Sequence, residues 1–142
     1  MLKIRHTGIY VHNLENMKDF YCKNFGMKVI VHAFEEGNYI DTVLGLENTV
    51  LELYKLIFED GTMLELIRRE EEKQTELRGN VYDIGCMHLA ITVNDIGQTV
   101  KILQKSDVTF LSKPTVSDDG NAKVCFCRDP EGNYLELVEE IV

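Results

Sequence analysis

The sequence has little of what marks disordered, secreted or membrane-spanning proteins. It contains 142 residues with 2 prolines and 4 cysteines, and 44% of the residues are hydrophobic. That composition is typical of an ordered globular protein. Met1 leads directly into a polar segment without the apolar run of a signal peptide, and no apolar stretch approaches the length of a membrane span. We therefore expect a cytoplasmic protein of one compact domain or two small modules.

Basic charge is also scarce. The 24 acidic residues outnumber the 15 basic ones and give a formal net charge of −9. Nucleic acids and anionic membranes need a basic surface to bind their phosphate groups. The charge balance therefore predicts neither of them as a partner.

The cysteines follow no disulfide or zinc-knuckle spacing, which favours reduced thiols in the protein interior. Cys125 and Cys127 are two positions apart in a strand-like segment, so their side chains share a face. We favour such core thiols over a redox or metal-binding role.

What the chain does contain is an internal repeat. "RHTGIYVHNL" at 5–14 resembles "MHLAITVNDI" at 87–96, with His6 and His88 82 positions apart. "DGTMLELI" at 60–67 resembles "EGNYLELV" at 131–138, with Glu65 and Glu136 71 positions apart. The difference of 11 positions indicates an insertion in the first copy, near residues 38–48.

Each copy has the pattern of a strand, a helix and three further strands. Asn13 is placed to cap the first helix and Gly26 to end it, and Asn94 or Asp95 caps the second. The expected strands of the first copy cover 4–11, 27–35, 50–58 and 62–68. Those of the second copy cover 86–93, 108–116, 121–128 and 133–140. The pattern predicts an α+β protein with a βαβββ module at 1–68, a charged linker at 69–84 and a second βαβββ module at 85–142.

In each copy, strand alternation places one histidine and one glutamate on the face opposite the aliphatic residues. His6 lies on the face opposite Thr7, Ile9 and Val11, and His88 follows the same rule. Glu65 and Glu136 lie opposite the leucines that flank them. Since a buried carboxylate needs a partner, a metal ion is one way to satisfy these glutamates.

If the two copies close around a shared cavity, the four residues can converge on one point. Two imidazoles and two carboxylates form a mixed nitrogen and oxygen site for one divalent metal ion. The ligand set does not distinguish nickel, cobalt, zinc, manganese and iron. Taken singly, each of these residues is more often a surface residue than a ligand, and the metal prediction depends on their matched positions. His12 and His32 have no equivalents in the second copy and are not included.

On these motifs, together with "RDPEGNYLELVE" at 128–139, the chain resembles the vicinal oxygen chelate superfamily. That superfamily includes glyoxalase I, methylmalonyl-CoA epimerase, extradiol dioxygenases and bleomycin-resistance proteins. The resemblance implies that the modules form a cupped, eight-stranded mixed sheet with helices on its outer face. It also implies His6, Glu65, His88 and Glu136 as ligands of a metal inside the cup.

The full set of two His and two Glu resembles the glyoxalase and epimerase branch. The resemblance implies a lyase or isomerase that acts on a small α-hydroxy or α-keto compound, or its thiol adduct, through a metal-held enediolate. Glu65 or Glu136 would transfer the proton. A methylmalonyl-CoA epimerase-like isomerase, a sequestering or resistance protein without catalysis, and an epoxide-opening resistance enzyme are alternatives.

Substrate selection is expected in the parts that differ between the copies or flank the ligands. The insertion at 38–48, Tyr10, Thr92 and Tyr134 are the predicted substrate-binding elements. Glyoxalase I typically has an arginine at the Tyr10 position that holds a glutathione carboxylate, so the resemblance does not extend to that contact. A homodimer is expected, with the metal ligands drawn either from one chain or from two chains that exchange modules.

Overall fold

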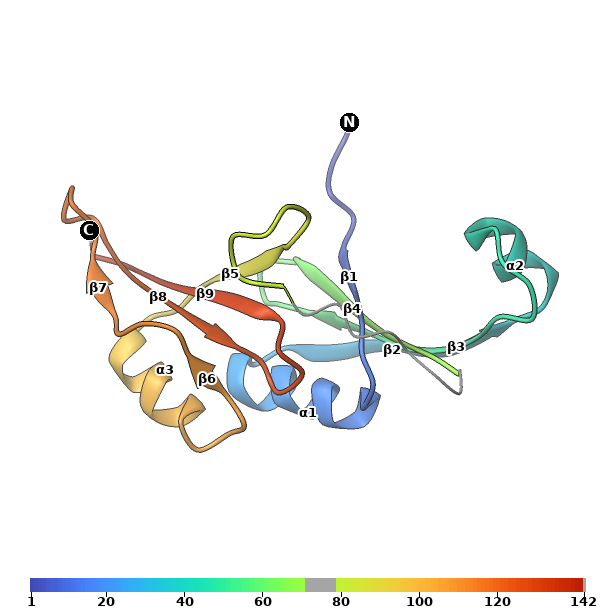
Figure 1. Ribbon diagram of the computed structural model, residues 1–142, viewed down its shortest axis with the longest axis horizontal. Coiled ribbons are helices and arrows are strands. Elements are labelled where there is room, and N and C mark those ends of the chain that lie inside the picture. The colour runs from blue at the N-terminus through green and yellow to red at the C-terminus, as the bar shows by residue number, and fades with distance from the viewer. Residues whose placement is uncertain (71–78, 142) are drawn as a thin grey trace. The chain divides into compact units, whose positions relative to one another are not determined.

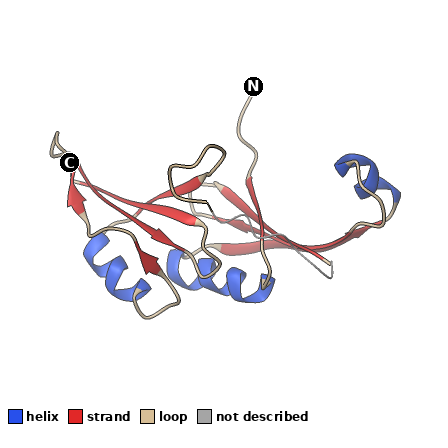
Figure 2. Cartoon of the chain, in the orientation of Figure 1, coloured by secondary structure: helices blue, strands red, loops and turns tan. Residues whose placement is uncertain are grey.

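The computed structural model describes residues 1–70 and 79–141, and the chain divides into two compact units, Met1–Thr75 and Glu76–Val142. Each unit is built mainly from strands (Figure 2). None of the helices in the described ranges is long and apolar enough to span a membrane. Part of the predicted linker, 71–78, lies outside the described residues, so the boundaries at 69–84 remain a prediction.

The first unit has the predicted order of strand, helix and three strands. Its elements are β1 (Thr7–Tyr10), α1 (Leu14–Phe25), β2 (Lys28–Glu36), α2 (Asn38–Leu44), β3 (Val50–Ile57) and β4 (Met63–Arg69). The strands form a sheet in the order β1-β4-β3-β2, with β1 parallel to β4 and the other pairs antiparallel. Asn13 Oδ1 accepts a hydrogen bond from Asn16 N and caps α1, and Gly26 ends it with a φ of 67°.

The second unit repeats this order with one strand divided. Its elements are β5 (His88–Thr92), α3 (Ile96–Leu103), β6 (Thr109–Phe110), β7 (Thr115–Val116), β8 (Ala122–Arg128) and β9 (Tyr134–Glu140). The sheet order is β5-β9-β8-β6, and β7 also pairs with β8. Asp95, one of the two predicted caps, accepts the bond from Gln98 N.

The division of β6 from β7 is the main departure from the predicted strands. A single strand is expected over 108–116, but Pro114 lacks the N–H that a continuous ladder needs. The Ser112 hydroxyl instead accepts a hydrogen bond from Phe126 N on β8. The described units therefore contain a four-stranded and a five-stranded mixed sheet, which confirms the α+β class and adds one short strand.

The aliphatic faces of both sheets form the cores. In the first unit, α1 packs on β3 and β4, where Met17, Leu56 and Leu66 are fully buried. In the second unit, α3 contacts β9, and Ile96 and Leu137 are fully buried. Glu65 and Glu136 thus lie on the faces opposite these core residues.

The predicted insertion forms helix α2, which lies at the far end of the β2–β3 hairpin (Figure 1). Its Ile40 packs against Leu51, Leu53 and Ile67, which are all buried. By strand register these three residues share the face that carries Glu65, opposite the face covered by α1. The insertion therefore covers one end of the proposed ligand face.

Cys125 and Cys127 are buried on the aliphatic face of β8, and all four cysteines are free. Burial raises the pKa of Cys127 to about 12, with smaller contributions from Cys125 and Asp129. The folded protein therefore keeps a proton that the unfolded chain releases near pH 9.

We expect the free energy of unfolding to fall by about 1.4 kcal/mol for each pH unit above about 9, because this thiol stays protonated only in the folded state. Urea unfolding at pH 8.5 and 10.5 measures the change. The Cys127→Ala variant should lose that part of the pH dependence, and an identical dependence in both proteins would contradict the assignment.

Candidate metal centre

Within the first unit, the structure brings His6 and Glu65 close together. Glu65 is near the middle of β4, and its Cα pairs with Gly8 of β1, two residues after His6. His6 Nε2 lies 3.6 Å from Glu65 Oε2. The Glu65 side chain is 13% exposed, so most of it is withdrawn from water.

The second unit brings His88 and Glu136 together in the same way. Ala90 takes the place of Gly8 and pairs with Glu136, and His88 Nε2 lies 3.1 Å from Glu136 Oε2. The Phe126 ring packs edge-on against the His88 imidazole, with the centroids 5.2 Å apart. Each unit therefore presents one imidazole and one carboxylate from its parallel strand pair.

These separations suit two ligands of one metal ion. Nitrogen and oxygen atoms bound at about 2.1 Å and about 90–110° apart are about 2.9–3.4 Å from each other. The 3.1 Å separation falls in that range, and 3.6 Å is slightly longer. Among the described residues, no group of three or more His, Cys, Asp or Glu side chains could hold a metal ion. Each pair would therefore supply only part of a coordination shell.

The predicted substrate-binding residues lie on the same faces as the pairs. Tyr10 is exposed on β1 and pairs with Ile67, while Thr92 is exposed at the end of β5 and pairs with Val138. Tyr134 pairs with His88 but is only 5% exposed.

The hydroxyl of Tyr134 already has protein partners. It accepts a hydrogen bond from Arg128 at 2.5 Å and donates one to the Gly79 carbonyl at 2.8 Å. The Arg128 guanidinium also lies over the ring, 4.7 Å from its centroid. These contacts fix the side chain beside His88, and its contact with substrate remains a prediction.

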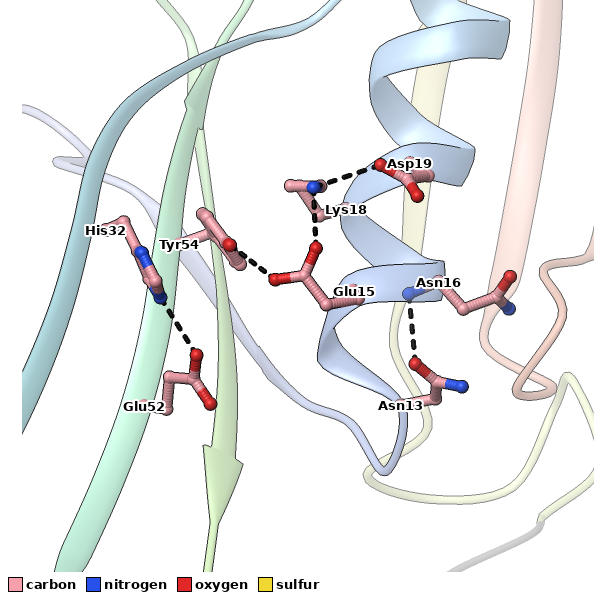
Figure 3. A network of polar contacts seen from close by, with 8 residues as sticks. All are labelled: Asn13, Glu15, Asn16, Lys18, Asp19, His32, Glu52 and Tyr54. Carbon is pink, nitrogen blue, oxygen red and sulfur yellow. Dashed lines mark hydrogen bonds and ion pairs between the residues drawn. The ribbon is translucent and has the colours of Figure 1, made fainter.

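A third His–Glu pair, which sequence reasoning left out, lies on the opposite face of the first sheet (Figure 3). His32 Nε2 is 2.9 Å from Glu52 Oε1, and its ring stacks on Tyr54 with centroids 4.2 Å apart. Arg68 donates to the other Glu52 oxygen at 2.7 Å. Since the guanidinium already neutralises Glu52, this pair is a poor candidate for a cation site.

The same network ties the sheet to α1. The Tyr54 hydroxyl donates a short hydrogen bond to Glu15, and Lys18 donates to the other Glu15 oxygen at 2.7 Å (Figure 3). The Lys18 ammonium, with help from the Tyr54 hydroxyl, holds the pKa of Glu15 below its ordinary value. The hydrogen bond to Glu15 raises the pKa of Tyr54. These contacts make the network a structural link between α1 and the sheet.

The family model described as the glyoxalase, bleomycin resistance protein and dioxygenase superfamily matches residues 3–137. The chain belongs to this superfamily. The predicted resemblance to this superfamily is thereby confirmed, since the match covers nearly the whole chain.

The chain is similar to several enzymes and solved structures of this superfamily. A lactoylglutathione lyase of Neisseria meningitidis is 24% identical over 98% of this chain and 91% of its own length. A glyoxalase family protein from Bacillus cereus is 25% identical with a TM-score of 0.91, covering 100% of this chain and 96% of that one. A trypanothione-dependent glyoxalase I from Leishmania major is 26% identical with a TM-score of 0.70, covering 99% of this chain and 88% of that one. These likenesses support a glyoxalase-like fold across the whole chain.

Proposed function

We propose that this protein is a metal-dependent lyase or isomerase of the glyoxalase type, acting on a small α-hydroxy or α-keto compound or its thiol adduct. The observation that carries the proposal is the His–Glu pair at matched positions of both units, with donor atoms 3.6 and 3.1 Å apart. Relatives named lactoylglutathione lyase support the reaction class.

The donor set fits a divalent first-row metal, because it combines imidazole nitrogens with carboxylate oxygens. His6, Glu65, His88 and Glu136 would hold the ion together, and nickel, cobalt, zinc, manganese and iron all accept these ligands. When bound, the ion supplies a positive charge that holds adjacent substrate oxygens and stabilises negative charge developing on them.

The carboxylates supply the proton transfer. Glu65 would detach from the metal to take a proton from the carbon beside the substrate carbonyl and return it to the neighbouring position while Glu136 stays a ligand, or the two would exchange these roles. Tyr10 and Thr92 are exposed on the ligand faces and are proposed to contact substrate. Tyr134 is proposed to act with them from beside His88. A cytoplasmic homodimer remains the expected form of the protein.

An activity assay tests the reaction class. Metal-stripped protein is loaded with Ni²⁺, Co²⁺, Mn²⁺ or Zn²⁺ and assayed on methylglyoxal with glutathione or another thiol, and separately on methylmalonyl-CoA. We expect metal-dependent turnover of a methylglyoxal thiol adduct and none by the stripped protein. Turnover of methylmalonyl-CoA alone would replace the lyase by an epimerase, and no turnover of either would contradict both activities. Tight binding of the adduct without turnover would support a sequestering protein instead.

A further inference from the structure

Lys55 is a charged residue on the ligand face of the first sheet that sequence reasoning did not single out. On β3 its Cα pairs with Glu65, and its Nζ lies 3.6 Å from Glu65 Oε2. Strand register places Gly8, Glu65, Lys55 and Val31 in one row across the sheet. The Lys55 side chain is 30% exposed, so its ammonium remains accessible beside a proposed metal ligand.

The internal repeat makes this lysine distinctive. In the second unit the matching row contains Ala90, Glu136 and Phe126, because Phe126 pairs with Glu136 as Lys55 pairs with Glu65. The small residue and the glutamate are thus retained in both rows. The third position is an ammonium in one unit and an aromatic ring against His88 in the other. If this position served to hold the metal, both copies would carry the same kind of residue there. The difference between Lys55 and Phe126 therefore points to a role in binding the substrate.

Charge balance indicates what Lys55 would bind. A divalent ion bound to Glu65 would neutralise the carboxylate that the Lys55 ammonium faces. The metal ion and the ammonium would then repel each other. Lys55 then needs another anion close to the metal. Resting on the function proposed above, we propose that Lys55 binds a carboxylate of the substrate while neighbouring substrate oxygens are held at the metal. The substrate class is therefore a carboxylated α-hydroxy or α-keto compound.

A matched pair of chelating ligands tests this role without an activity assay. Succinic monohydroxamate and butyrohydroxamate carry the same hydroxamate group, but one ends in a carboxylate and the other in a methyl group. Titration of the Co²⁺-loaded protein, followed by the cobalt absorption spectrum, gives the dissociation constant of each. We expect the wild type to prefer the carboxylated ligand about threefold to fivefold, the upper part of the range for a partly exposed ion pair.

Three variants identify the source of the preference. Lys55→Met should reduce the preference to below about twofold and leave butyrohydroxamate binding within about twofold of the wild type. Lys55→Arg, which keeps the charge, should retain most of the preference. Lys101→Met removes an exposed lysine of α3 and should behave as the wild type. If Lys55→Met does not fold, as judged by circular dichroism, Lys55→Gln takes its place.

The outcomes separate this proposal from the one it rests on. Failure of the wild type to bind Co²⁺ would overturn both. Cobalt binding with no preference for the carboxylated ligand, or a full preference in Lys55→Met, would overturn the role of Lys55 and leave the metal centre standing. Equal weakening of both ligands in Lys55→Met would assign the lysine to the metal site rather than to substrate recognition.

Discussion

Replacing the one of Glu65 and Glu136 that transfers the proton by glutamine is expected to lower kcat at least about 100-fold on whichever substrate the wild type turns over. Glutamine keeps the size of the side chain but removes the charged oxygen that accepts a proton, and general acid–base catalysis contributes about 10²- to 10⁴-fold. Both glutamates lie on the ligand face of their sheet beside a histidine. Steady-state kinetics at saturating metal measures the loss.

Glu52 provides the matched control for these variants. It stands in a third "LEL" motif at 51–53, but on the opposite face of the first sheet, where it contacts His32 and Arg68. Glu52→Gln should retain kcat within about twofold. Activity above half the wild-type value in both Glu65→Gln and Glu136→Gln would contradict a catalytic role for either carboxylate.

Replacing His6 or His88 by alanine is expected to weaken metal binding about 100-fold or more. Each change removes one nitrogen ligand, and the remaining three side chains cannot replace it. Competition with a chromophoric chelator measures the affinity.

His32→Ala serves as the control, since it removes a histidine from the third pair and not from the ligand faces. Its affinity for metal should stay within about twofold of the wild type. Wild-type affinity in either His6→Ala or His88→Ala would show that the residue is not a ligand.

Much of the candidate site could be predicted from patterns within a single strand or between the two copies of the repeat. Alternation is local, so it places Glu65 and Glu136 on the face opposite their flanking leucines without knowledge of the partner strands. The repeat then pairs each glutamate with the histidine of its own copy. Caps such as Asn13 and Gly26 are also local, which is why α1 begins and ends where predicted.

Other features depend on information that one strand does not carry. Lys55 lies opposite Glu65 because of the register between β3 and β4, and the length of the turn that joins the two strands determines this register. The offset between the repeats locates the insertion at 38–48, but the position of α2 on the ligand face depends on Ile40 packing against three buried residues. The break between β6 and β7 reflects a single proline and a side-chain hydrogen bond.

The stoichiometry of metal binding tests the four-ligand centre most directly. Metal-stripped wild-type protein is titrated with Co²⁺ and the bound metal is measured per chain. The proposed centre predicts one tightly bound ion per chain, whether the ligands come from one chain or from two exchanging chains, and its loss in both His6→Ala and His88→Ala. Two weak ions per chain, each lost in only one of these variants, or no bound ion at all, would contradict it.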